Sequence, residues 1–227
     1  MAASKRVALY YTPTSCGAAS FIAAHRGGLD FDAYQVDLKT HTFQTASGAK
    51  DFYAVNPKGN VPCVVLADGT ILNENVATLS WIADQNLSAK NAPANGTSER
   101  AALLNVLSFL ASELHASFGL IFGGQTPEQK AWGKQRVERA LGLVEKWALA
   151  DKQYLVGGDL TVADLYAHIV IGWAEIPFIA VDLKPFPKTL AYLSRVRQHA
   201  DVVAAQASIK TNPVSTKPGA AATPAAK

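Results

Sequence analysis

The stretch LYYTPTSCGAAS, residues 9–20, decides the fold that we expect for this chain. Its first residues are aliphatic or aromatic, which is typical of a buried strand that we place at residues 7–11. The turn Thr-Pro-Thr-Ser ends this strand. The alanine-rich segment from Cys16 to His25 then predicts a helix that stops before Gly27 and Gly28. The sequence thus places a cysteine at the start of a helix that directly follows a strand.

Cys16 has several possible roles: a packing residue, half of a disulfide, a metal ligand or a nucleophile. Backbone N–H groups at the start of a helix are unpaired and carry partial positive charge. We therefore expect the pKa of the Cys16 thiol to be lowered and its nucleophilicity to be raised. The alternative is a small, buried, inert side chain.

The following segments continue an α/β pattern. FDAYQVDL at 31–38 predicts a second strand, and the polar stretch after it predicts a loop. PCVVLA at 62–67 and TIL at 70–72 predict two strands joined by a tight Asp68-Gly69 turn, and ENVATLSWIA at 74–83 predicts a helix. We expect residues 1–85 to form one compact α/β domain.

The pattern changes after residue 85. The polar segment 86–98, NLSAKNAPANGTS, contains proline and glycine and predicts a linker. Leucines at helical spacing beyond it predict an all-helical domain over 99–210. The low-complexity sequence TNPVSTKPGAAATPAAK at 211–227 predicts a disordered tail.

Composition restricts the class of protein. Of the 227 residues, 49% are hydrophobic and 17% are charged, which suits a large core, and the net charge of +3 is too small to indicate nucleic acid as a partner. We expect no membrane span, because no apolar run reaches about 18 residues. Two cysteines cannot build a disulfide framework, so we expect a cytoplasmic protein. No metal-ligand spacing or phosphate-binding glycine loop is present.

Two motifs flank the last strands of the first domain. A cis bond at Val61-Pro62 would aim the backbone of Val61 outward to pair with an extended peptide, although Pro62 could simply end a loop. Glu74 and Asn75 begin a predicted helix, where backbone N–H groups favour a carboxylate and Glu74 could receive an ammonium group. The alternative for this pair is ordinary capping by Asn73.

Two motifs lie in the helical region. Asn105, Ser108, Ser112 and His115 are three or four residues apart, which predicts a shared helix face of small polar groups that lines a cleft. A bystander role for His115 is the alternative. Thr161 with an acid three residues later has the pattern of a capping box, which is a folding device.

Taken in order, these motifs resemble the cytosolic glutathione transferases, and most closely the bacterial beta class, over residues 7–205. The resemblance is carried by YYTPTSC, FDAYQVDL, YAVNPKGNVP, LADGTILNENVA, FLASELHASF and LTVADLY. It implies a thioredoxin-like α/β N-terminal domain, an all-α C-terminal domain and a homodimer. It also implies glutathione as a cosubstrate, with no tightly bound cofactor.

The resemblance implies particular roles. Cys16 and His115 would be catalytic, and the glutathione contacts would be Cys16, His41, Val61, Pro62, Glu74, Asn75, Ser108, Ser112 and His115. The glutathione thiolate would attack a small hydrophobic electrophile, held by Thr14, the His115 helix and the C-terminal helices. In a second mode, Cys16 itself would exchange with mixed disulfides or reduce peroxides.

The sequence also departs from the family pattern. Ala116 stands where a lysine is common, which removes a positive charge near the thiol, and Cys63 stands where a small apolar residue is usual. Tyr11 and Ser15 are fallback hydroxyl donors to the sulfur. The other functions that we considered are a non-catalytic carrier of glutathione and hydrophobic ligands, and a glutathione-consuming dehalogenase or isomerase.

Overall fold

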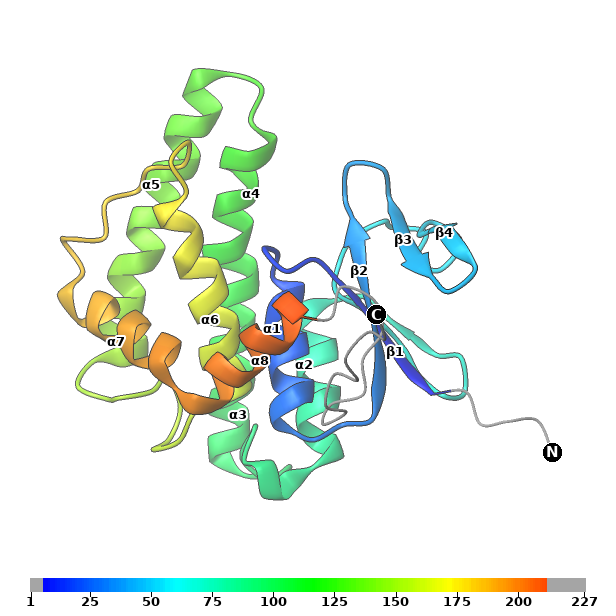
Figure 1. Cartoon of the computed structure of the whole chain (residues 1–227). Coiled ribbons are helices and arrows are strands. Elements are labelled where there is room, and N and C mark those ends of the chain that lie inside the picture. Colours follow the sequence, from blue (N-terminus) through cyan, green and yellow to red (C-terminus); the bar gives the residue numbers. More distant parts are fainter. Residues whose placement is uncertain (1–5, 212–227) are drawn as a thin grey trace.

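A six-stranded sheet in the order β4-β3-β2-β1-β5-β6 forms the first half of the fold (Figure 1). The computed structural model describes residues 6–211. The elements of this half are β1 (Val7–Tyr11), α1 (Gly17–Arg26), β2 (Phe31–Asp37), β3 (Thr42–Thr45), β4 (Gly48–Asp51), β5 (Cys63–Val65), β6 (Ile71–Leu72) and α2 (Asn75–Gln85). β1 and β2 are parallel and are joined through α1, whereas the other neighbours pair antiparallel.

The two faces of the sheet pack against different partners. Alternate side chains of a strand point to opposite faces. Leu9 and Tyr11 therefore join the core beneath α1 and α2, while Tyr10 lies in a second cluster on the other face. Cys63 pairs with Tyr10 across the two strands, is fully buried in that second cluster, and is a structural thiol whose pKa burial raises to about 11.

The hairpin of β3 and β4 is a difference from the sequence prediction, which expected a loop after β2. Phe43 is the one buried residue of the hairpin, and its ring packs edge-on against Tyr10, with 4.9 Å between centroids. All four residues of β4 are exposed. The hairpin therefore shows no alternation of apolar and polar residues, and a pattern-based prediction misses it.

Helices make up the second half (Figure 1). They are α3 (Ser98–Phe109), η2 (Leu110–His115), α4 (Ala116–Gly123), α5 (Pro127–Leu143), η3 (Val144–Leu149), α6 (Val162–Gly172), α7 (Pro187–Gln198) and α8 (Ala200–Thr211), with short 3₁₀ turns at η1 (Leu87–Ala89) and η4 (Trp173–Glu175). Both η2 and η3 are π-helical. Of the α6 residues, nine of eleven are buried, so α6 is the central helix of this half.

The segment between the halves is fixed by ion pairs and amide contacts. Arg100 makes two hydrogen bonds to the Asp84 carboxylate, and Arg26 reaches both Asn91 and Asp201. The Asn91 backbone carbonyl also accepts from Val162 at the start of α6. These contacts hold α1, α6 and α8 together. Apart from its first residue, the tail predicted for 211–227 lies outside the described residues.

The predicted cap of α6 is present and is larger than expected. The Asp164 carboxylate accepts hydrogen bonds from the backbone N–H and the hydroxyl of Thr161. It also accepts from the backbone of Leu155 and from the hydroxyl of Tyr192. Asp164 is fully buried, so one carboxylate connects the start of α6 to a preceding loop and to α7.

Among the described residues, one helix, Ser98–Gly123, is long and apolar enough to cross a membrane by length and composition alone. This helix is the continuous run of α3, η2 and α4. It packs against α5 and α6 in the helical half. Such a central helix passes the same test without spanning a membrane, so the finding is weak evidence for a span.

Candidate active site

Cys16 lies at the N-cap of α1, directly after the turn that follows β1, and only 6% of its surface is exposed. Its Sγ donates a hydrogen bond to the Val61 carbonyl oxygen at 3.4 Å. Burial raises the pKa of the thiol to about 12, although the backbone N–H groups of Cys16 and Gly17 favour the thiolate. The predicted lowering of this pKa was therefore wrong, because desolvation outweighs the helix N-terminus.

The Val61-Pro62 peptide bond is cis. This is one of the two possibilities that the sequence left open. Val61 lies beside the cysteine and lines the same cavities. Gly17 lets the start of α1 pack closely on β1. A Cβ at position 17 would lie 3.2 Å from both the Ser15 hydroxyl and the Tyr11 Cβ, which is tighter than ordinary contact.

A small polar cavity of about 180 Å³ lies at the starts of α1 and α2, and its lining residues are Cys16, Asn60, Val61, Glu74, Asn75, Val76, Ala111, His115 and Tyr166. Glu74 is the N-cap of α2, and its carboxylate pairs with Lys58 at 2.6 Å. The amide Nδ2 of Asn75 is buried and makes no hydrogen bond of ordinary geometry. The cavity thus offers an exposed carboxylate and an unpartnered amide donor.

His115 enters this cavity from the end of the π-helical segment η2. Its Nδ1 lies 2.6 Å from the hydroxyl oxygen of Tyr166, a fully buried residue of α6. Its ring meets that of Trp173 edge-on, with 4.9 Å between centroids. Burial lowers the pKa of His115, so the ring is neutral at physiological pH.

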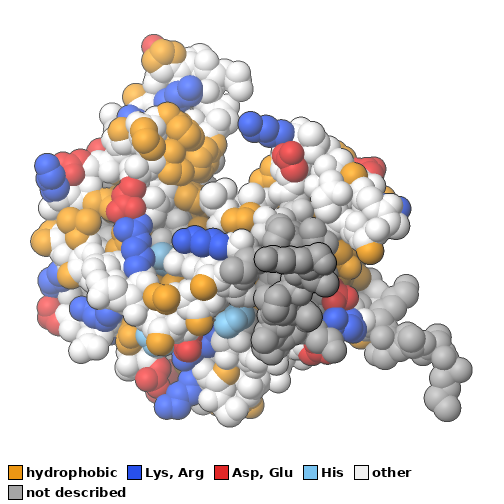
Figure 2. Space-filling model, viewed as in Figure 1, with side chains coloured by type: hydrophobic (Ala, Val, Ile, Leu, Met, Phe, Trp, Pro, Cys, Tyr) orange, Lys and Arg blue, Asp and Glu red, His pale blue; other side chains and the backbone are white. Residues whose placement is uncertain are grey.

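A larger, mainly apolar cavity of about 750 Å³ opens on the other side of Cys16 and His115, and its lining residues are Thr12, Thr14, Ser15, Cys16, Leu38, Asn60, Val61, His115, Phe122, Trp173, Ile176 and Phe178. Trp173 forms part of its wall, and its indole N–H donates to the Thr14 carbonyl at 3.0 Å. Figure 2 shows hydrophobic side chains gathered on the helical half beside the hollow between the two halves.

The two cavities share four lining residues: Cys16, Asn60, Val61 and His115. A ligand in the small polar cavity and a ligand in the large apolar cavity would therefore meet at the cysteine and the histidine. Within residues 6–211, no Lys or Arg is among the lining residues of either cavity. Among these residues, the groups placed to stabilise an anion at the meeting point are neutral hydrogen-bond donors and the start of α1.

Ser108 and Ser112 are exposed and line neither cavity, although the sequence grouped them with His115. The Ser112 hydroxyl donates to the Ser108 backbone carbonyl at 2.9 Å. The grouping assumed 3.6 residues per turn throughout. The π-helical segment at Leu110–His115 adds a residue to the turn and rotates the histidine inward, away from the two serines.

His41 lines neither cavity. It has a positive φ of 51°, and its ring packs on Tyr53 with 4.5 Å between centroids. It follows β2, and its backbone carbonyl accepts a hydrogen bond from Phe52, close to β4. The predicted contact between His41 and glutathione is therefore not supported by the cavities that the single chain forms.

The two fallback hydroxyls have other partners. Tyr11 is fully buried, and its hydroxyl accepts from the Gln35 amide outside both cavities. Burial raises the pKa of Tyr11 to about 12. Ser15 lines the large cavity, but its hydroxyl proton goes to the Thr12 carbonyl at 2.9 Å. Tyr11 thus lies away from both cavities, and the Ser15 proton is already donated to a backbone carbonyl, so neither hydroxyl is placed to donate to a sulfur beside Cys16.

Sequence reasoning missed Tyr166 as a site residue and did not assign Trp173 to the site. Both come from the apolar run LYAHIVIGWA, in and just after α6, which predicts core packing. They lie 51 and 58 residues beyond His115 along the chain. The available signal was a hydroxyl and an indole N–H in a mainly apolar run that also contains His168, because buried groups of this kind need partners.

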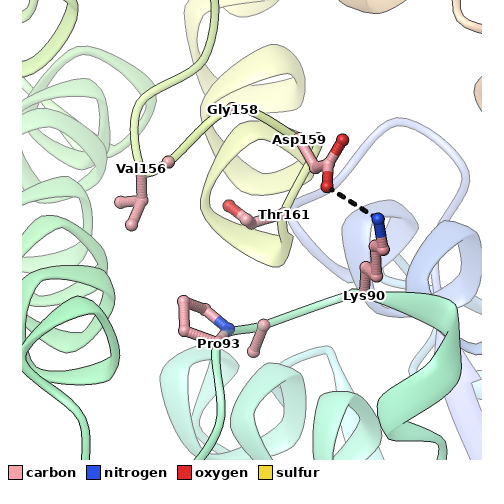
Figure 3. A pocket seen from close by; sticks show the side chains of 8 residues that line it. Lys90, Pro93, Val156, Gly158, Asp159 and Thr161 are labelled. Atoms are coloured by element: carbon pink, nitrogen blue, oxygen red, sulfur yellow. Dashed lines mark hydrogen bonds and ion pairs between the residues drawn. The ribbon is translucent and has the colours of Figure 1, made fainter.

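Another cavity, of about 190 Å³, lies where the segment after α2 meets the start of α6 (Figure 3). Lys90 and Asp159 reach toward one another there, with 3.3 Å between Nζ and Oδ2. This pair is exposed, and the cavity has no thiol or imidazole. Within residues 6–211, no group of three or more His, Cys, Asp or Glu side chains could hold a metal ion.

Comparison with known proteins agrees with this two-part site. A family model described as the glutathione S-transferase N-terminal domain matches residues 16–85, and one described as the C-terminal domain matches residues 109–200. The chain is 34% identical over 196 residues to glutathione S-transferase GstA of Escherichia coli O157:H7, covering 86% of this chain and 94% of that protein.

Solved structures agree in fold. A bacterial beta class glutathione S-transferase from Sphingomonas chungbukensis has a TM-score of 0.80 and 38% identity, covering 88% of this chain and 98% of that one. A sphingomonad glutathione S-transferase complexed with glutathione has a TM-score of 0.81 and 36% identity, covering 90% and 100%. The fold is that of a two-domain transferase with a thioredoxin-like first half. The chain belongs to the glutathione S-transferase family.

Proposed function

We propose that the chain binds glutathione in the small polar cavity and joins its sulfur to a hydrophobic electrophile held in the large apolar cavity. The observation that carries this proposal is that the two cavities meet at Cys16 and His115. A thiolate placed there faces polar groups on one side and an aromatic wall on the other. The relatives named above support glutathione as the cosubstrate, because one of them was solved with it.

Each part of the tripeptide has a matching group in this site. The Glu74 carboxylate suits the γ-glutamyl ammonium group, since it is exposed and ends at the small cavity. The unpartnered Asn75 amide suits the γ-glutamyl carboxylate. The backbone of Val61 suits the cysteinyl peptide group, which places the sulfur beside Cys16 and His115.

The reaction is a nucleophilic substitution by the glutathione sulfur. The thiol releases its proton to solvent, and the thiolate forms a C–S bond with the electrophile while a halide or similar group leaves with the electron pair. The N–H groups at the start of α1 and the side chains of Cys16 and His115 stabilise the thiolate. His41, Ser108 and Ser112 remain predicted contacts, because they lie outside the cavities of the single chain.

The protonated state of Cys16 favours conjugation over thiol exchange as the main reaction. Its thiol donates to Val61 and has a raised pKa, so it acts as a hydrogen-bond donor in the free protein. Exchange with a glutathione mixed disulfide would require this thiol to ionise first, then attack a sulfur and expel a thiolate. We therefore assign Cys16 to stabilising the glutathione sulfur.

The variant Cys16→Ala separates these two reactions. Conjugation of glutathione to an aryl halide should fall by about tenfold, because one donor to the thiolate is lost. Cys63→Ala is the matched control, since Cys63 packs on the far face of the sheet, and it should leave turnover unchanged. Unchanged conjugation in Cys16→Ala, with disulfide reduction abolished, would contradict the assignment.

We also propose that the protein is a cytoplasmic homodimer. Both cysteines are free, which suits a reducing compartment. Leu104 and Trp132, on two helices of the second half, have 40% and 53% of their surface exposed, and a second copy would cover such side chains. Sedimentation equilibrium should give twice the chain mass. A monomer at micromolar concentration would contradict the proposal.

A further inference from the structure

Tyr166 makes the hydrogen bond that fixes the His115 ring. Its hydroxyl oxygen lies 2.6 Å from His115 Nδ1, and the two rings meet edge-on at 5.8 Å. Tyr166 is fully buried in α6, yet its side chain lines the small cavity. The other ring nitrogen of the histidine, Nε2, makes no hydrogen bond within the described residues, and the ring lines both cavities.

The direction of this bond follows from the surroundings of the hydroxyl. If the ring donated from Nδ1, the hydroxyl proton of Tyr166 would need another acceptor in a buried position. The neighbouring amide of Asn75 lowers the pKa of Tyr166 through a side-chain hydrogen bond, so it is a donor toward the hydroxyl oxygen and cannot accept the hydroxyl proton. The hydroxyl proton therefore goes to Nδ1, which makes Nδ1 the acceptor and leaves the single ring proton on Nε2.

We propose that Tyr166 is a positioning residue that holds His115 in the Nε2–H tautomer, so that the ring presents an N–H donor to the glutathione sulfur. This inference rests on the proposed function, because it gives His115 the task of stabilising that sulfur. It also assigns a role to a neutral imidazole in cavities whose lining, in the described part of the chain, has no lysine or arginine. The side chain acts on the reaction only through the histidine.

The charged and titratable groups that face His115 support a neutral ring. Burial lowers the pKa of His115 itself. Burial raises the pKa of Tyr166, and the nearby Cys16 raises it further, so the hydroxyl keeps its proton. The remaining titratable residue of the small cavity, Glu74 at the start of α2, is paired with Lys58. Removing the tyrosine hydroxyl would take away a bond made to the neutral ring and should raise the pKa of His115.

The test is Tyr166→Phe, which removes the hydroxyl and keeps the buried ring. Nitrogen-15 NMR of the histidine rings should show the Nε2–H tautomer for His115 in the wild-type protein and a mixture of tautomers in the variant. The value of kcat/KM should fall by about fivefold, with the KM for glutathione unchanged, and the acid limb of the pH profile should move to higher pH.

Tyr192→Phe is the matched control, because it also removes one buried hydroxyl, here bonded to Asp164. It should lower the melting temperature without changing the His115 signal or the pH profile. An Nδ1–H tautomer or a cationic ring in the wild-type protein at neutral pH would overturn the inference. So would a Tyr166→Phe protein with unchanged tautomer and pH profile. If wild-type protein did not turn over glutathione at all, the proposed function would fail, while the tautomer measurement would still decide the bond.

Discussion

Alkylation of Cys16 tests the surroundings of this thiol. Burial raises the pKa of Cys16 from 9.0 to about 12. The protonated thiol donates a hydrogen bond to the Val61 carbonyl oxygen at 3.4 Å. The thiolate fraction at neutral pH is therefore about a thousandfold smaller than for an ordinary cysteine, since each pKa unit changes it tenfold. Reaction with iodoacetamide should be slower by a similar factor, because only the thiolate reacts.

The assay uses the Cys63→Ala variant, so that a single thiol remains, and follows alkylation by mass spectrometry from about pH 6 to about pH 10. The logarithm of the rate should rise linearly with pH over the whole range without reaching a plateau. The same chain unfolded in urea is the control, and it should level off near the ordinary cysteine pKa of 8.5–9. A plateau below about pH 8 in the folded protein would refute the reasoning, because it would show that the start of α1 outweighs burial.

Three other side chains give sharp outcomes. Asp164→Ala should lower the free energy of unfolding in urea by about 3 kcal/mol, because buried donors lose their acceptor; a loss under about 1 kcal/mol would contradict this. Burial lowers the pKa of His168 from 6.5 to about 4, so the unfolded chain takes up the proton first. Stability should therefore fall as the pH drops from about 6.5 to about 4, by roughly 3 kcal/mol, and His168→Gln should remove that decline; equal slopes for both proteins would refute it. Phe178→Ala should raise the KM for an aryl electrophile about fivefold, whereas Trp147→Ala, half-exposed and outside the large cavity, should not; equal effects would contradict a role for Phe178.

The parts of the fold that the sequence predicted are those with local patterns. The strand before Pro13, the helix that stops at Gly27 and the Asp68-Gly69 hairpin all depend on neighbouring residues. The β3–β4 hairpin was missed, because it has a single buried side chain, Phe43, which packs on Tyr34 of the neighbouring β2 and on Tyr10 of β1. A local sequence pattern thus predicts a helix or strand well only where several buried side chains recur at the spacing of that element.

The candidate site divides in the same way. Cys16 and the cis Val61-Pro62 bond lie at the ends of local motifs, and the structure brings Val61 beside the thiol. The hydrogen-bond partner of His115 could not be predicted from the sequence. Tyr166 is 51 residues away, on a helix whose sequence predicts only core packing. The pKa of Cys16 was predicted in the wrong direction, because the degree of burial depends on tertiary packing that no short motif reports.

The most direct test of the central claim is the ionisation of glutathione on the wild-type protein. Burial keeps Cys16 and Cys63 protonated near neutral pH, so the ultraviolet absorbance of thiolate comes from glutathione, and a protein-free glutathione solution is subtracted to leave the bound tripeptide. S-methylglutathione, which lacks the thiol, is the blank. The account predicts saturable binding at millimolar glutathione and a thiolate signal that titrates well below the ordinary thiol pKa of about 8.5. Absence of saturation, or a bound thiol that titrates at its ordinary pKa, would contradict it.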